Sequence, residues 1–315
     1  MKKVAIMCAR GLGDALLMMI VAHQFKCSGY KPTVFHDYAK ELPSLFKDVC
    51  IFPYPSLNQL EETLTPFEQV IIENDHSRRA YDLFRLREAK KLNNLTFFFP
   101  TASPKFQKGD FLFDPTLPIA SNICRACQTI LQTRNTTKEN GIYIPQGIHY
   151  KYPKRIVIHP TSNDRKRNWL SSQFFSLAQH LQNEGYSISF SVSPSERTHW
   201  LHVERQGFQV PFFSDLSELS AYLYESGFFI GNDSGIGHLA SNLGIPTLTI
   251  SGNPKRVRLW RPDWHIGHVV TPPFPLPNFK GLRLPIRENF WQRFISVSRT
   301  LNAFYNLRES TCKLQ

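Results

Sequence analysis

Residues 231–246 constrain the fold more than any other stretch of this chain, because they place a glycine-rich turn between two apolar, strand-like segments. Residues 228–230 precede the turn, a short helical pattern follows it, and a Gly-Ile-Pro exit leads into residues 247–250. A turn of this kind presents backbone N–H groups at a helix N-terminus, where an anion such as a nucleotide diphosphate binds. The stretch therefore predicts an α/β unit with an anion site at the end of one strand.

Strand-like and helix-like segments also alternate along the rest of the chain, which is typical of parallel sheets flanked by helices. We expect strands at 4–8, 33–36, 49–52, 69–73, 95–99, 155–159, 187–192, 209–213, 228–230 and 247–250. We expect helices at 15–26, 37–46, 76–92, 122–134, 172–184, 195–206, 217–226 and 287–307. The pattern predicts two doubly wound α/β domains in tandem. Ligands of such sheets bind beyond the carboxyl ends of the strands, so the cleft between two facing domains is the expected active site.

The chain has 315 residues, which suits two domains. Turn-forming residues mark a boundary at 144–154, so we expect an N-terminal domain over 1–150 and a C-terminal domain over 151–285. Residues 271–285 carry five prolines and are expected to cross between the domains as extended chain. Residues 286–315 are expected to form a closing helix that packs back on the N-terminal domain. Its apolar face comprises Phe290, Phe294, Val297, Leu301 and Phe304.

The formal net charge of +12 favours an anionic partner, because the basic residues cluster. The clearest cluster lies on the helix predicted at 76–92, which is either a solubilising face or a docking surface for a phosphorylated acceptor or an anionic lipid. Its basic residues are Arg78, Arg79, Arg85, Arg87, Lys90 and Lys91. Nucleic acid is not expected as a partner, because no RNP-like, zinc-finger or helix-turn-helix signature occurs.

The six cysteines are scattered and do not suggest a disulfide framework, so we expect a reducing, cytoplasmic compartment. Cys124 and Cys127 form a lone C-x-x-C pair, which we expect inside a core helix rather than in a zinc or redox site. Arg10 and Asp14 interrupt the first apolar stretch, so we expect no signal peptide. The apolar run at 15–22 is far too short to span a membrane.

The first chemically suggestive loop, Arg-Gly-Leu-Gly-Asp-Ala-Leu-Leu at 10–17, directly follows the first predicted strand. It begins like a dinucleotide-binding fingerprint, but Leu16 stands where the third glycine belongs. Asp14 lies where the loop becomes a helix. It is either a helix cap or a general base toward a hydroxyl, and the two roles are compatible.

The second loop, residues 159–169, follows the first strand of the second domain. It combines the hydroxyls of Thr161 and Ser162 with three consecutive cations at 165–167. Hydroxyls, cations and backbone N–H groups together suit phosphate oxygens, although a solvated basic loop would have the same composition.

The third constellation is the turn within 231–246. Asp233 would repel a diphosphate, so we expect it to hold sugar hydroxyls or to fix the turn. The amides of residues 234–237 are expected to take the phosphate, and His238 is either a ligand or a core histidine. No Asp-x-Asp pair occurs anywhere, so the common carboxylate cradle for a nucleotide-bound metal is absent. We therefore expect no metal and no cofactor, with amides and cations as the counter-charge.

These three motifs together resemble glycosyltransferase family 9, the ADP-heptose:lipopolysaccharide heptosyltransferases of the GT-B fold. The resemblance covers nearly the whole chain and is most specific in Gly-Asn-Asp-Ser-Gly-Ile-Gly-His-Leu-Ala at 231–240. It implies inverting, metal-independent transfer of heptose from ADP-heptose to an inner-core lipopolysaccharide acceptor. The partners would be a nucleotide sugar and an anionic glycolipid, met at the cytoplasmic face of the inner membrane.

The resemblance also implies roles for particular residues. Asp14 matches the catalytic base, and Arg10, Arg78, Arg79 and Arg85 are candidates for acceptor binding. The donor and its phosphates would be bound by Thr161, Ser162, Lys166 or Arg167, Glu196, Asp233, Ser234, Gly235 and His238.

The chain departs from the family pattern around Trp169, where the family commonly has Lys, one residue, Trp and Pro. Lys166 lies three residues before Trp169 and Arg167 two residues before it, so the sequence leaves open which cation serves. Two rival functions also stay open: another GT-B sugar-nucleotide enzyme such as an epimerase, and a non-catalytic nucleotide-sugar-binding homologue.

Overall fold

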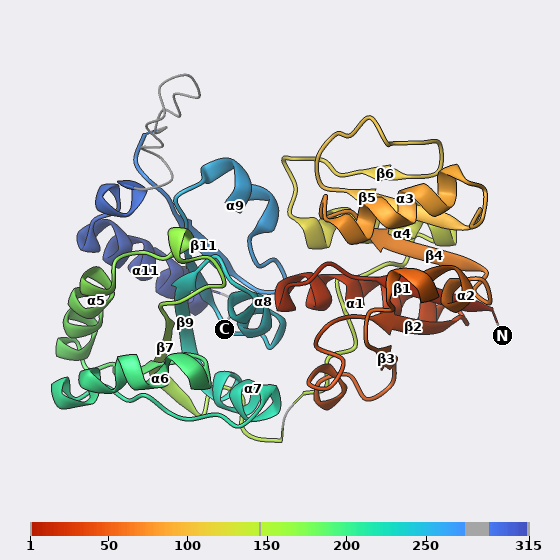
Figure 1. The fold of residues 1–315 in the computed structure, drawn as a ribbon. Helices are drawn as coiled ribbons and strands as arrows, with labels where there is room; N and C mark the ends of the chain where they lie inside the picture. The colour runs from red at the N-terminus through yellow and green to blue at the C-terminus, as the bar shows by residue number, and fades with distance from the viewer. Residues whose placement is uncertain (1, 145, 275–289, 314–315) are drawn as a thin grey trace. The chain divides into compact units, whose positions relative to one another are not determined.

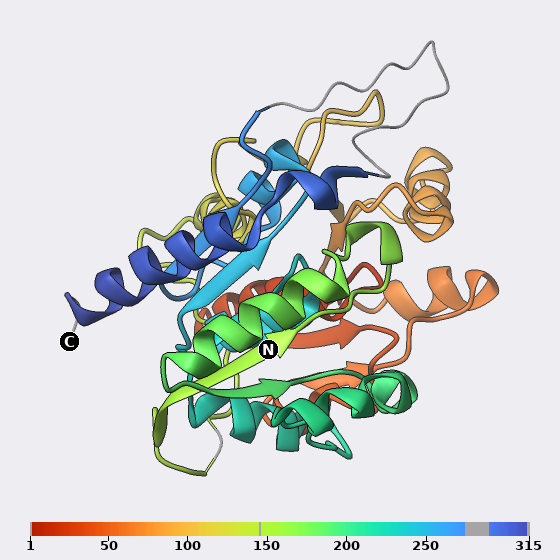
Figure 2. The same cartoon turned by 90° about the vertical axis from the view of Figure 1, so that its left-hand side faces the viewer.

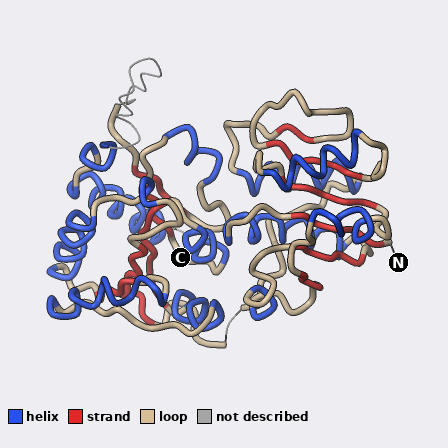
Figure 3. Tube along the Cα trace, viewed as in Figure 1, coloured by secondary structure: helices blue, strands red, loops and turns tan. Residues whose placement is uncertain are grey.

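The computed structural model describes residues 2–144, 146–274 and 290–313, and these form two compact units, Met1–Tyr143 and Ile144–Gln315 (Figure 1). The structure divides the chain between Tyr143 and Ile144, whereas the sequence predicted the boundary at residue 150. Each unit contains one parallel sheet with helices on both faces (Figure 3). The prediction of two Rossmann-like α/β domains is therefore confirmed.

The first unit contains a six-stranded sheet in the order β3-β2-β1-β4-β5-β6, with every neighbouring pair parallel. The strands are β1 (Lys3–Met7), β2 (Lys31–Phe35), β3 (Cys50–Phe52), β4 (Gln69–Glu73), β5 (Leu95–Phe99) and β6 (Phe111–Leu112). The strand order reverses between β1 and β4, and ligands of doubly wound sheets bind at such a switch point. The carboxyl ends of β1 and β4 are therefore where a site is expected in this unit.

The helices of the first unit are α1 (Leu12–Cys27), α2 (Leu60–Leu64), α3 (Arg78–Glu88) and α4 (Ile119–Leu131), with 3-10 turns η1 (Leu42–Ser44) and η2 (Leu57–Gln59). The helix predicted at 37–46 is wrong, since only η1 forms there. Pro43 supplies no N–H to continue a helix, and the amide of Tyr38 is taken by His36 Nδ1 at 3.0 Å. Cys124 and Cys127 are buried in α4, as expected.

The second unit contains a five-stranded parallel sheet in the order β11-β10-β9-β7-β8. The strands are β7 (Tyr152–His159), β8 (Ser187–Phe190), β9 (Ser226–Asn232), β10 (Thr247–Ile250) and β11 (Gly267–Val270). The strand predicted at 209–213 is reduced to a single bridge between Ser189 and Gln209. The order of this sheet reverses between β7 and β9, which places a second switch point at their carboxyl ends.

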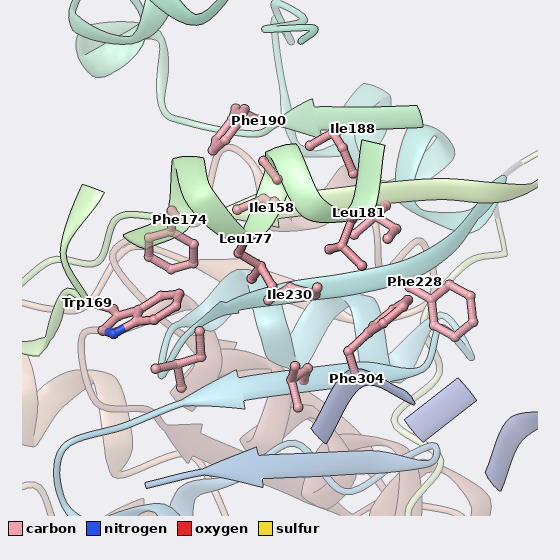
Figure 4. Packing of buried hydrophobic residues seen from close by; sticks show 14 of the residues in the cluster. Ile158, Trp169, Phe174, Leu177, Leu181, Ile188, Phe190, Phe228, Ile230 and Phe304 are labelled. Carbon is pink, nitrogen blue, oxygen red and sulfur yellow. The ribbon is translucent and has the colours of Figure 1, made fainter. Parts of the chain in front are cut away.

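Helices surround this second sheet, and their apolar faces form its core. They are α5 (Ser171–Asn183), α6 (Pro194–Trp200), α7 (Leu216–Tyr224), α8 (Gly235–Asn242), α9 (Pro254–Trp260) and α11 (Val297–Cys312), with 3-10 turns η3 (Arg165–Arg167), η4 (Leu201–Gln206) and η5 (Trp291–Phe294). Figure 4 shows Leu177 and Leu181 of α5 pointing toward Ile158 and Ile230 of the sheet, and all four side chains are buried.

The predicted return of the C-terminal helix to the N-terminal domain stays a prediction. The helix packs against α5, β10 and β11 of the second unit (Figure 2). The physical reason for this packing is its apolar face, because Phe304 and Leu307 are fully buried in the core of the second sheet. The helix begins only at Val297, where the Ser296 hydroxyl caps the amide of Arg299 at 3.2 Å.

Phe290 and Phe294, which were predicted on the apolar face of that helix, precede it and are 48% and 36% exposed. Most of the proline-rich segment predicted to cross between the domains falls within residues 275–289, outside the described residues.

Candidate active site

In the first unit, the loop after β1 places Asp14 at the switch point. The amide of Gly11, the N-cap of α1, donates to Asp14 Oδ2 at 2.9 Å. A Cβ at position 11 would lie 2.5 Å from Asp14 Oδ2, so any larger residue there would push this carboxylate out of its position. Asp14 is the third residue of the helix, where its carboxylate binds the amide of that cap. This contact differs from the predicted N-cap, and a role of Asp14 as a base is compatible with it.

A second carboxyl group, Glu73, lies beside Asp14 and was missed by the sequence analysis. It is the last residue of β4, is 6% exposed, and accepts a hydrogen bond from the amide of Ala9 at 3.0 Å. Its side chain also hydrogen-bonds that of Asp14. Burial, followed by the negative charge of Asp14, raises the pKa of Glu73 well above its usual value. The sequence does contain a signal for Glu73, which is an acidic residue at the end of a mostly apolar strand.

Other buried polar groups surround this pair. His36 follows β2 and is fully buried, and burial lowers its pKa. Cys8 follows β1, and burial raises the pKa of its thiol. Asn74 is 1% exposed, and its Nδ2 atom has no hydrogen-bond partner within the described part of the chain. The carboxyl edge of the first sheet is thus richer in buried polar groups than a purely structural edge requires.

The basic residues predicted to bind the acceptor are in different situations. Arg79 is bound to Asp37 through two hydrogen bonds of 3.0 and 2.8 Å, and its guanidinium lies 4.3 Å from the centre of the Tyr54 ring. Arg10, Arg78 and Arg85 are exposed. The arginine therefore most firmly held at this edge of the sheet is Arg79, whereas the other three present solvated cations.

In the second unit, the loop after β7 brings together residues that are far apart in the sequence. Thr161 Oγ1 donates to Glu196 Oε2 at 3.1 Å, and the same oxygen accepts from the Ser193 hydroxyl at 2.7 Å in the capping box of α6. The Ser162 hydroxyl donates to Asn168 Oδ1 at 2.6 Å. Glu196, which the resemblance placed at the nucleotide, therefore lies against the predicted phosphate loop.

The two candidate cations of this loop differ. Lys166 is exposed, and its backbone carbonyl accepts from Trp291 Nε1 at 2.9 Å. Arg167 Nη1 lies 3.8 Å from Asp233 Oδ2, so its guanidinium is directed to the turn after β9. This geometry associates Arg167, rather than Lys166, with the predicted donor-binding turn.

A third cation, Arg256 of α9, was missed by the sequence analysis. Arg256 Nε donates to Asp233 Oδ2 at 3.1 Å, so the 6%-exposed carboxylate of Asp233 is shared by two guanidinium groups. The sequence offered no local signal for this, because 23 residues separate Arg256 from Asp233 along the chain. Asp233 was expected to fix the turn. In the structure it forms an Arg-Asp-Arg cluster with Arg167 and Arg256 at the carboxyl end of β9.

The turn itself is joined to the loop after β7 by a buried asparagine. Asn232 Nδ2 donates to the carbonyl of Pro160 at 2.7 Å, and Asn232 Oδ1 accepts from the amide of Trp169 at 2.9 Å. After it, Ser234 and Gly235 open α8, so the N–H groups of its first turn lie beside Asp233. His238 is buried, its ring is nearly perpendicular to that of Trp264, and burial lowers its pKa, which fits a neutral core histidine.

The described residues were also compared with the requirements of a metal site and of a membrane-spanning helix. Over residues 2–144, 146–274 and 290–313, no group of three His, Cys, Asp or Glu residues lies close enough together to hold a metal ion. None of the helices described in those ranges is both long and apolar enough to span a bilayer.

Comparison with known protein families finds a match to part of the chain. Residues 128–270 match glycosyltransferase family 9 (heptosyltransferase). No curated protein matches the chain significantly.

Solved structures agree with the fold. A family 9 glycosyltransferase from Veillonella parvula DSM 2008 has a TM-score of 0.69 at 16% identity, with 97% of each chain covered. The E. coli heptosyltransferase WaaC with ADP has a TM-score of 0.66 at 14% identity, with 97% of this chain and 99% of that chain covered. The E. coli ADP-heptose lps heptosyltransferase II has a TM-score of 0.65 at 15% identity, with 98% of both chains covered.

At these identities the structural likeness establishes the fold, and the family match over 128–270 adds the activity class. Residues 128–270 contain the loop after β7, Glu196, the Asp233 turn and Arg256, which are the motifs at the second switch point. The chain is therefore a glycosyltransferase of the GT-B fold that carries a family 9 (heptosyltransferase) domain.

Proposed function

We propose that this chain is an inverting, metal-independent heptosyltransferase that uses ADP-heptose and an inner-core lipopolysaccharide or related glycan acceptor. The observation that carries the proposal is the Arg167–Asp233–Arg256 cluster beside the N-terminus of α8, inside the family 9 domain. Two guanidinium groups and a helix N-terminus together suit a diphosphate. The names of the E. coli neighbours, one with ADP and one an ADP-heptose enzyme, support the donor assignment.

In this proposal the second unit binds the donor. Arg167 and Arg256 each carry a charge that Asp233 only partly neutralises, so they retain attraction for the diphosphate and for the charge it gains as a leaving group. The amides at the start of α8 add hydrogen bonds to the same oxygens. Thr161, Ser162 and Glu196 hold the nucleoside side of the donor, and Asp233 orients the two arginines. This assigns the counter-charge to protein cations, which is the basis for proposing metal independence.

The first unit supplies the base and binds the acceptor. Asp14 takes the proton of an acceptor hydroxyl while the acceptor oxygen forms its bond to the anomeric carbon of the donor. The bond from that carbon to the phosphate oxygen breaks, and its electron pair leaves with the nucleoside diphosphate. Attack from the face opposite the leaving group inverts the anomeric configuration.

The acceptor is expected to be anionic, because the exposed cations Arg10, Arg78 and Arg85 belong to this unit. Exposed Tyr81 lies among them on α3, and an aromatic ring beside cations suits the surface of an anionic membrane. We propose that the enzyme works at the cytoplasmic face of the inner membrane, where it makes peripheral contact.

The direct test is to incubate the purified chain with ADP-heptose and a truncated inner-core acceptor, with mass spectrometry of the product and NMR of its anomeric linkage. We expect transfer with inversion, and we expect it to persist with a chelator present. Asp14→Asn should lower kcat by about 100-fold to 10,000-fold, the range of general-base contributions. Absence of transfer by the wild type with ADP-, GDP- and UDP-sugars would contradict the proposal.

Incubation with the donor alone distinguishes the transferase from an epimerase, since an epimerase turns over without an acceptor.

Paired variants test which cation, Arg167 or Lys166, binds the donor diphosphate. Arg167→Ala should raise the KM for the donor and lower kcat, whereas Lys166→Ala, which changes an exposed side chain of the same loop, should change both much less.

A further inference from the structure

We propose that Glu73 is a positioning residue for Asp14, acting as a carboxylic acid whose O–H donates to the Asp14 carboxylate and holds it in the orientation that a base requires. This inference rests on the proposed role of Asp14 and adds a residue that neither the motifs nor the family match contains, since Glu73 lies outside residues 128–270.

The geometry at the first switch point carries the argument. Strands β1 and β4 pair in register, with Met7 opposite Ile72, so Glu73 is the first residue beyond that pair. From there its Oε2 atom accepts the amide of Ala9, while the amide of Gly11 binds Asp14 Oδ2. The two carboxyl groups thus bind two amides of the loop between β1 and α1, and a hydrogen bond joins the two groups to each other.

The surroundings of Glu73 indicate where the shared proton resides. Glu73 is 6% exposed, and the charges acting on it, from Asp14 and Asp75, are negative. Cys8 and His36 face the same edge, and burial favours the neutral form of each. Two adjacent carboxylates repel each other unless one is protonated, and desolvation penalises the more buried charge. The proton therefore stays on Glu73, and Asp14 remains the acceptor.

Glu73 is chemically unchanged by the transfer step. The proton of the acceptor hydroxyl goes to Asp14, and Glu73 keeps its own proton throughout. What Glu73 contributes is orientation, and a catalytic group misplaced by about 1 Å costs about 100-fold in rate. The loss on removing Glu73 should accordingly appear in kcat and not in the KM for the donor, which the other unit binds.

The experiment compares Glu73→Ala with Glu73→Gln. The glutamine amide can still donate to Asp14 and accept from Ala9, so we expect it to recover most of the loss seen with alanine. Glu73→Ala should lower kcat by about 100-fold and move the acid limb of the kcat profile to higher pH, because the Asp14 carboxylate loses a donor. Glu68→Gln, an exposed glutamate just before β4, is the matched control and should behave as wild type.

A kcat of Glu73→Ala close to wild type would overturn the proposal, and so would a loss in Glu73→Gln as large as in Glu73→Ala. A second measurement does not need turnover. At neutral pH, the infrared difference spectrum of wild type minus Glu73→Gln should contain the C=O band of a protonated carboxylic acid, and Asp14→Asn should shift it. Absence of the band would overturn the proposal even if Glu73→Ala fails to fold. Wild-type inactivity would contradict the proposed function instead, with the band still reporting on the carboxyl pair.

Discussion

A buried ion pair in the first unit allows the sharpest stability prediction. Asp110 accepts hydrogen bonds from Arg87 Nη1 at 2.8 Å and from the amides of Phe97 and Gln107, each at 2.9 Å. The side chains of Asp110 and Arg87 are 1% and 11% exposed. Asp110→Ala therefore removes one carboxylate that serves three donors, one of them a nearly buried cation.

The expected loss in the free energy of unfolding follows from the Arg87 cation that Asp110→Ala leaves behind. Breaking a buried ion pair by removing one partner costs about 3–5 kcal/mol, because the remaining cation, Arg87, stays largely buried without an opposite charge and keeps, among the described residues, only the Lys105 carbonyl as a hydrogen-bond acceptor. With a urea slope of about 2 kcal/mol per molar, the unfolding midpoint should fall by about 2 M. Arg87→Met should cost less, since Asp110 would keep the amides of Phe97 and Gln107.

Urea unfolding with hydrogen exchange read by peptide mass spectrometry is the appropriate assay, because it localises the effect. Peptides covering β5 should lose protection, and peptides covering β9 in the second unit serve as the internal reference. Asp48→Ala, which breaks the exposed pair with Lys26, is the control and should change nothing measurable. An Asp110→Ala midpoint within error of wild type, or an Arg87→Met loss larger than that of Asp110→Ala, would refute the reasoning.

Three further predictions concern single positions. Gly11→Ala would place a Cβ 2.5 Å from the end of the flexible Asp14 side chain, so kcat should fall about 100-fold with little change in melting temperature, and an unchanged kcat would contradict this. Gly227→Ala would place a Cβ 1.9 Å from the backbone oxygen of Pro153, which cannot move aside, so the second unit should lose about 3 kcal/mol or more in urea unfolding. Burial lowers the pKa of His238, so as pH falls through about 6.5 the unfolded chain binds a proton that the folded unit does not. Stability should therefore decrease from about pH 7 to pH 5, and His238→Asn should flatten that slope in tryptophan fluorescence, which reports only on the second unit because all five tryptophans lie there.

The loops that carry the chemistry were predictable, because each is a local signal. A strand of apolar residues followed by glycine and then a helical pattern needs only a dozen neighbouring residues to be recognised. Asp14, Thr161 and Asp233 were found in this way, and the structure places each at the carboxyl end of its strand. The spacing to Trp169 could not show whether Lys166 or Arg167 serves the donor-binding turn, because this depends on which side chain faces Asp233.

Two features of the fold could not be predicted from local patterns. The C-terminal helix was recognised by its apolar periodicity, but periodicity does not specify which sheet that face covers, and Phe304 is buried in the second core. The helix predicted at 37–46 failed because Pro43 and the hydrogen bond from Tyr38 to His36 compete with helix formation.

The sequence by itself determined the alternation of strands and helices, the two-domain organisation and the glycine-rich turns, because these depend on residues close together in the chain. Only the tertiary structure decided the pairing of Glu73 with Asp14 and the sharing of Asp233 by Arg167 and Arg256. Those contacts arise where the strand order reverses, between β1 and β4 and between β7 and β9. Strand order is set by the packing of whole elements, so the partners of each carboxylate could not be read from the residues beside it.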